Sequence, residues 1–69
     1  MDNYLKRIKQ ATTKEELQKI SSDACKNESN KVWDKVIHNC IVRELELGIN
    51  PYQDRILKEN NGKIPAYRK

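Results

Sequence analysis

The amino-acid sequence predicts an all-α fold: a small single domain of three main helices, followed by a short fourth helix and a basic C-terminal tail. Apolar residues recur at roughly three- to four-residue spacing without the alternation of strands, which is the pattern of helices with one apolar face. The two glycines and two prolines of the 69 residues all lie in the C-terminal third, so no helix breaker interrupts the earlier part. We assign residues 1–62 to the helical domain and residues 63–69 to the tail.

The first two helices are placed by residues that can cap their N-termini. The first is predicted from Asp2 or Asn3, either of which can be the N-cap, to Gln10. The second opens at Thr12 or Thr13, because each threonine has a glutamate three residues later, which is the capping-box pattern. Both registers fit, so the start of the second helix stays open by one residue.

The third helix is predicted to begin after Ser29 or Asn30 and to end at Leu47, with Gly48 as its left-handed C-cap. Its apolar residues sweep through about half of the helical wheel, more than the stripe of a surface helix. We therefore expect it at the centre of the fold, packed against more than one neighbour. Val42 falls on its polar side and is expected to be exposed, because isolated apolar residues are normal on a surface.

The fourth helix is predicted to have Asn50 as its N-cap and Pro51 as its first helical residue, and to reach Asn60 or Asn61, where Gly62 terminates it. The tail that follows has two possible states. Either Ile64 and Tyr67 pin it to the domain, or its residues fray as chain ends often do.

The net charge of +4 is concentrated at the two ends of the sequence. Residues 1–10 carry +2 and residues 51–69 carry +3, whereas the middle is close to neutral. Basic ends around a neutral middle suit contact with a polyanion from two edges, although a solvated surface would show the same charges. The candidate DNA-facing residues are Lys6, Arg7, Lys9, Lys63, Arg68 and Lys69.

Neither catalysis nor metal binding has a supporting pattern. A chain of 69 residues leaves little room for a deep active-site cavity, and no nucleophile or second histidine accompanies His38, which we expect on a solvated face. Cys25 and Cys40 lack the spacing of a redox pair or a zinc site. We expect no enzyme activity, catalytic residue, metal or cofactor, and two reduced thiols of which Cys40 is buried.

The most specific pattern lies in residues 4–20. It reads Tyr4-Leu5-Lys6-Arg7-Ile8-Lys9, then Thr12-Thr13, then Glu16-Leu17-Gln18-Lys19-Ile20. This opening resembles the Hha/YmoA family of small nucleoid-associated regulators of enterobacteria, whose members are about this size. Two later segments are also similar to the family: Asn39 with Glu44-Leu45, and Gly62-Lys63-Ile64-Pro65.

The sequence also departs from the family at positions that matter for function. Asn39, Cys40 and Ile41 stand where the family has Asp, His and Arg. The family's late Trp has no counterpart near Pro65, where only Tyr67 is aromatic. The partner-binding part of the comparison is therefore its least similar part.

The resemblance implies a four-helix protein without enzymatic activity that binds the N-terminal dimerisation region of the nucleoid protein H-NS or a relative, and so acts on transcription. It implies DNA-facing positions at Arg7 and Lys9 and a functional position at Asn39. With Arg43 and Trp33, Asn39 forms our candidate partner-binding set, although Trp33 fits the core as well.

Two other functions stay open: a phage- or plasmid-type inhibitor of another host protein, and a direct DNA-binding protein that uses both basic ends. A helix-turn-helix is disfavoured, because the third helix is too apolar to offer polar groups to base edges. We expect a cytoplasmic protein, nucleoid-associated if the resemblance holds, without a membrane segment or a small-molecule substrate.

Overall fold

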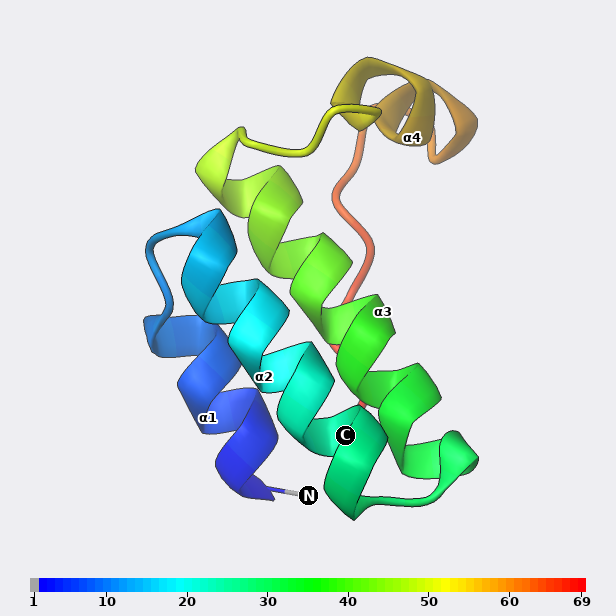
Figure 1. Ribbon diagram of the computed structural model, residues 1–69. Helices are drawn as coiled ribbons and strands as arrows, with labels where there is room; N and C mark the ends of the chain where they lie inside the picture. The colour runs from blue at the N-terminus through cyan, green and yellow to red at the C-terminus, as the bar shows by residue number, and fades with distance from the viewer. Residues whose placement is uncertain (1) are drawn as a thin grey trace.

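The computed structural model describes residues 2–69, with Asp2 described through its backbone alone. It contains four helices, which are α1 (Asp2–Gln10), α2 (Lys14–Asn27), α3 (Asn30–Leu47) and α4 (Gln53–Glu59). No strand occurs among these residues. The predicted all-α class, with three main helices and a short fourth, is confirmed. Figure 1 shows α1, α2 and α3 side by side, with α4 beyond one end of them.

The hydrophobic core lies where α1, α2 and α3 meet. Both α1 and α2 pack against α3 as well as against each other, so the predicted central place of α3 is confirmed. Half-buried aromatic and aliphatic side chains, Trp33 among them, pack around the core. The buried cluster itself consists of Ile8, Ala11, Leu17, Ile20, Ala24, Val36 and Cys40.

Side-chain caps fix the starts of α2 and α3. Thr13 is the N-cap of α2, and its hydroxyl oxygen accepts from the Glu16 N–H at 3.3 Å. The capping box is only half formed, because the Thr13 hydroxyl bonds the Glu16 carboxylate and no return bond reaches the Thr13 backbone. Ser29 caps α3 by accepting from the Val32 N–H. Gly48, at φ 72°, closes α3 in the left-handed conformation that was predicted.

Of the other two helix starts, that of α1 agrees with the prediction and that of α4 does not. α1 runs from Asp2 to Gln10, as predicted, and the expected cap by the Asp2 side chain lies outside the described part of the chain. α4 begins at Gln53 rather than at Pro51. The Asn50 side chain accepts from the Tyr52 N–H at 2.8 Å, which holds Pro51 and Tyr52 in a turn ahead of the helix.

The prediction that Val42 lies on an exposed side of α3 is wrong. Only 1% of Val42 is accessible. The C-terminal tail returns along this side of α3, drawn in orange to red in Figure 1, and α3 side chains on the same arc bond its backbone. His38, expected on a solvated face, is half-buried for this reason. The polar side chains of this arc therefore mark a docking face for the tail.

The tail is pinned to the domain, and Tyr67 is the residue that packs against the core. Ile64, the second expected anchor, remains 43% exposed. Ile64 is instead one of the exposed large apolar residues, with Ile49 and Tyr52, that flank α4 in the sequence. α4 itself contains no buried residue and stands apart from the three-helix body.

Replacing Val42 with alanine tests the docking face. We expect Val42→Ala to lower the free energy of unfolding by about 2 kcal/mol, because it removes two buried methyl groups and leaves a void under the tail. Urea unfolding followed by circular dichroism measures the change. Ile64→Ala is the control and should shift stability by less than about 0.5 kcal/mol. Equal small effects of both substitutions would contradict the burial of Val42.

Candidate functional site: a basic cleft between α1 and the C-terminal tail

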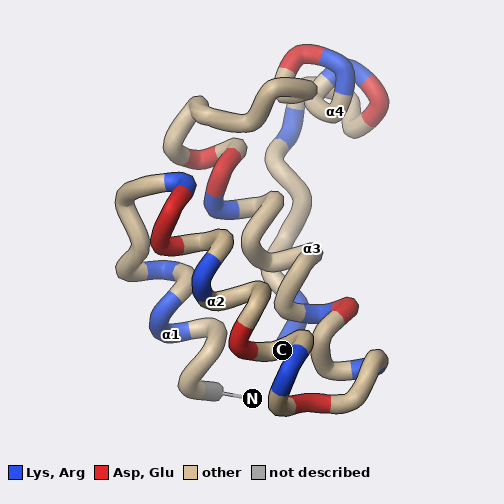
Figure 2. Tube along the Cα trace, viewed as in Figure 1, with Lys and Arg blue, Asp and Glu red and all other residues tan. Residues whose placement is uncertain are grey.

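The two basic ends of the sequence meet in space. An open cleft of about 400 Å³ lies between α1 and the end of the tail, and three of its five lining residues are lysines. Figure 2 shows Lys and Arg on α1 and near the end of the chain. The apolar side chain of Leu5 forms part of the wall between these cations. The lining residues are Leu5, Lys6, Lys9, Gln10 and Lys69.

Tyr67 joins the tail to α1. The Lys9 ammonium nitrogen lies 5.2 Å from the centroid of the Tyr67 ring, a cation–π contact. The Tyr67 hydroxyl donates to the Glu46 carboxylate. Burial raises the pKa of Tyr67 to about 12, and the hydrogen bond and charge of Glu46 add to the shift. The Tyr67 ring is therefore engaged on one face by Lys9 and at its hydroxyl by Glu46.

Asn39 holds the tail where it reaches the cleft. Its side-chain oxygen accepts from the Arg68 N–H at 2.7 Å, and its side-chain nitrogen donates to the Arg68 carbonyl at 2.8 Å. Only 1% of Asn39 is exposed. Both hydrogen bonds are part-buried, and the amide group finds its partners in a single tail residue.

Two other α3 side chains also bond the tail backbone. The His38 Nε2 lies 2.9 Å from the Ala66 carbonyl oxygen, and the Lys35 Nζ donates to the Lys69 carbonyl at 3.4 Å. The tail is thus held through its main chain as well as through the Tyr67 side chain. The side chains of Arg68 and Lys69 stay exposed and available for other contacts.

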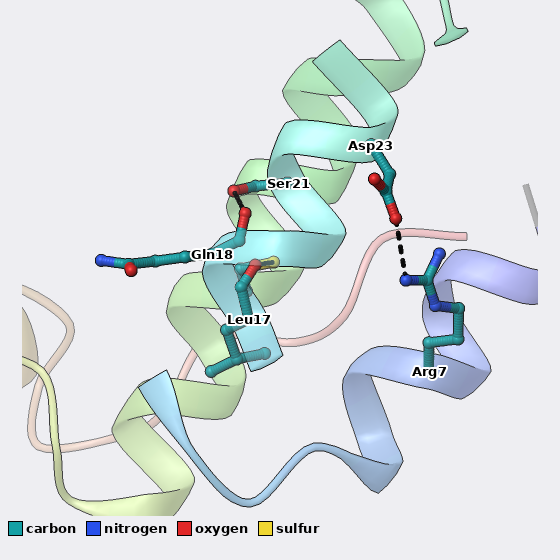
Figure 3. Close-up of polar contacts among 6 residues, drawn as sticks. Arg7, Leu17, Gln18, Ser21 and Asp23 are labelled. Carbon is teal, nitrogen blue, oxygen red and sulfur yellow. Dashed lines mark hydrogen bonds and ion pairs between the residues drawn. The ribbon is translucent and has the colours of Figure 1, made fainter. Parts of the chain in front are cut away.

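The remaining predicted basic residues lie elsewhere. Arg7 pairs with Asp23 at 3.0 Å and links α1 to α2, as Figure 3 shows, and its guanidinium carbon is 6.0 Å from the Tyr4 ring centroid. Lys63 follows α4 at the far end of the tail, where its carbonyl accepts from the Asn60 side chain. Neither Arg7 nor Lys63 lines the cleft.

The predicted partner-binding set does not form one surface. Asn39 is buried under the tail and cannot contact a partner while the tail stays docked. The Arg43 Nε donates to the Ala11 carbonyl at 2.9 Å, which links α3 to the end of α1. The Arg43 Nη1 donates to the Glu46 carboxylate at 3.4 Å. Trp33 packs half-buried against the core. Each of the three side chains thus has an intramolecular role.

A second, smaller hollow of about 110 Å³ lies between α2 and α3. Leu17 and Cys40 line it from the core, and half-buried Ile37 and Ile41 line it near the surface. This is where the broad apolar arc of α3 reaches solvent beyond α2. Figure 3 shows the nearby Ser21 hydroxyl, which donates to the Gln18 carbonyl at 2.9 Å. The polar rim of the hollow is formed by Lys14, Gln18, Ser21 and Glu44.

Both cysteines are free thiols, one exposed at Cys25 and one buried at Cys40 as predicted. The Cys40 sulfur lies 3.7 Å from the Leu17 carbonyl, toward which its S–H points. Burial raises the pKa of Cys40 to about 12, and the charge of Glu44 adds to the effect. Within residues 2–69, no three His, Cys, Asp or Glu side chains gather to hold a metal ion. No helix of this part is long and apolar enough to cross a membrane.

Several residues of the site were missed by sequence reasoning. Leu5 and Gln10 complete the cleft, and Glu46 anchors Tyr67. One feature of the sequence could have indicated the docked tail. Val42 lies among polar residues on one side of α3, and an apolar residue there is consistent with another segment covering that side. Nothing in the sequence pointed to the paired hydrogen bonds of Asn39, because they depend on a segment almost thirty residues away.

Thiol accessibility tests this description. An aromatic disulfide reagent should react quickly with Cys25 in the native protein, and with Cys40 only after unfolding, because a buried thiol with a raised pKa supplies almost no thiolate at neutral pH. The released chromophore gives the rate. The Cys25→Ser variant should show no fast phase until urea is added. A fast phase in that variant would contradict the buried state of Cys40.

No family model, curated protein or solved structure matches this chain.

Proposed function

We propose that this protein is a non-enzymatic regulatory module that binds a nucleoid protein of the H-NS type and adds a cationic face to the complex, which contacts DNA phosphates. The observation that carries the proposal is the convergence of Lys6 and Lys9 from α1 with Lys69 from the tail on a single cleft. The similarity of residues 4–20 to the Hha/YmoA family supports the choice of partner.

The cleft suits phosphate rather than base recognition. Its polar lining consists of three lysines and one glutamine, with no acidic residue among them. Lysine ammonium groups bind phosphate oxygens as point charges and position a protein on DNA without reading sequence. The Tyr67 ring has Lys9 over it and its hydroxyl is bonded to Glu46, so this ring is already engaged within the protein. The DNA contact is therefore auxiliary.

The protein contact is assigned to the hollow between α2 and α3. Half-exposed Ile37 and Ile41 beside a rim of polar residues match the apolar core and polar rim of protein interfaces. Asn39, which holds the tail, and Ile41 are two positions apart on α3, so they point about 200° apart. A partner docked on the hollow would leave the basic cleft open to DNA, because the hollow and the cleft share no lining residue.

We propose binding without catalysis because of the kinds of side chain that line the cleft. A general acid–base mechanism needs a group poised to exchange protons near neutral pH beside a nucleophile or an orienting partner. The cleft offers lysines, an amide and an aliphatic side chain. The proposal therefore assigns binding alone to this face.

Titration calorimetry against an H-NS-type dimerisation domain tests the protein contact. We expect saturable heat with the wild-type protein and at least tenfold weaker binding by Ile41→Asp, because a carboxylate would enter the apolar hollow. Ile64→Asp is the matched control, since Ile64 is exposed near α4, and should bind like wild type. Absence of heat with the wild-type protein would overturn the proposal and leave inhibition of another host protein as the alternative.

The DNA contact is tested by the salt dependence of duplex binding by the complex. The complex should bind DNA more tightly than the partner domain alone, and each of Lys6→Gln and Lys9→Gln should reduce the slope of log K against log salt by about 0.9, because one fewer counterion is released. Lys58→Gln on α4 is the control and should leave the slope unchanged. If the isolated protein binds DNA as tightly as the complex does, direct DNA binding replaces this proposal.

A further inference from the structure

We infer that Asn39 is the positioning residue of the basic cleft: by holding the backbone of Arg68, it places Tyr67 and Lys69 of the tail against Lys9 of α1. The effect on binding rests on the proposed function of the cleft. The position of the tail does not, and it can be measured on the isolated protein.

The geometry of Asn39 is that of a specific clamp. Its two side-chain hydrogen bonds, at 2.7 and 2.8 Å, go to the N–H and the C=O of the same residue, Arg68. A donor and an acceptor fixed together define both the position and the direction of the bonded peptide, as paired bonds do between strands. Among the described residues, Asn39 is also the buried polar side chain of the domain. While the tail is docked, loss of either bond would leave a polar group of the buried Asn39 side chain without its partner.

The other bonds to the tail are weaker constraints. His38 and Lys35 each make one hydrogen bond to the tail, and both bonds are exposed to water. The bond from Lys35 to the Lys69 carbonyl is also long, at 3.4 Å. Exposed single bonds exchange with water at little net cost, whereas Asn39 makes two part-buried bonds to one residue from a side chain that is itself buried. Among the α3 side chains that bond the tail backbone, Asn39 is therefore the main determinant of where Arg68 lies.

Fixing Arg68 fixes its two neighbours, because consecutive Cα atoms are only about 3.8 Å apart. Tyr67 lies under Lys9 on one side of the clamp, and Lys69 lines the cleft on the other. The Arg68 side chain is exposed. If the tail were released, the cleft would lose Lys69, and Lys9 would lose its cation–π contact with the Tyr67 ring.

This role separates Asn39 from a direct contact residue. Asn39 was expected to touch a partner, yet it is buried and all its effect on binding must pass through the tail. If Asn39 acts by positioning the tail, substituting Asn39 and removing the Lys69 charge should weaken DNA binding through the same lost contact, so their effects should not add. A direct contact predicts that the two losses are independent.

The first experiment measures the tail itself in the full-length chain. We expect Asn39→Leu to speed hydrogen exchange of the Arg68 amide at least tenfold, while amides of the α3 core stay protected. Asn60→Leu is the matched control, because it removes an asparagine bond to the tail backbone at Lys63, outside the cleft. NMR exchange rates decide the result. An Arg68 amide that stays protected in Asn39→Leu would overturn the inference.

The second experiment is a double-mutant cycle on DNA binding by the complex with the H-NS-type domain, at fixed salt. We expect Asn39→Leu and Lys69→Gln each to weaken binding about threefold, and the double variant to be no weaker than Asn39→Leu alone. Lys63→Gln controls for loss of one tail charge away from the cleft. Additive effects would show that Asn39 does not act through Lys69, and would overturn the inference.

The two experiments keep the two proposals apart. If the wild-type complex does not bind DNA, the proposed role of the cleft is lost, and the Arg68 exchange rate still decides whether Asn39 positions the tail. If the complex binds DNA but Arg68 exchange is unaffected by Asn39→Leu, the cleft stands and the clamp does not.

Discussion

An extended segment that packs on a helix must find hydrogen-bond partners for its own backbone, because the backbone of the helix interior is already bonded to itself. Between Ala66 and Lys69, the tail of this protein meets that constraint through side chains of α3. Asn39 supplies a buried donor and acceptor, and His38 and Lys35 supply single bonds nearer the surface. The position of these polar groups on one arc of α3 determines the course of the tail. The cleft, the burial of Val42 and the contact between Lys9 and Tyr67 all depend on it.

The tail also completes a small hydrophobic core. A domain of this size buries a modest share of its surface, so each added cover over α3 matters. α1 and α2 cover one side of α3, and the tail covers another. Docking brings positive charges from both ends of the chain together, which is unfavourable in itself. The ring of Tyr67 under Lys9 and the carboxylate of Glu46 beside the Tyr67 hydroxyl moderate that repulsion.

The predictable part of the fold is the part encoded by near neighbours in sequence. Thr13, Ser29 and Gly48 mark helix ends through bonds to residues three or four positions away, and the pattern around them is readable without a structure. The width of the apolar arc on α3 likewise placed this helix at the centre. The basic residues were identified by composition, but which of them meet depends on the tail. Asn39 was placed on a partner surface because residue identity does not reveal burial by a distant segment.

α4 and its flanking turns form a loop whose two ends are both held on α3. α3 ends at Gly48, and the chain then turns away from it at Pro51 and Tyr52. It returns to α3 at Arg68, whose backbone is hydrogen-bonded to the Asn39 side chain. α4, which lies inside this loop, has no buried residue and so adds nothing to the core. The entropic cost of lengthening such a loop is small, about 0.6 kcal/mol for each doubling. The segment from Asn50 to Gly62 is thus a natural insertion point, where a reporter peptide or a second domain could be grafted with the three-helix body and the docked tail left in place.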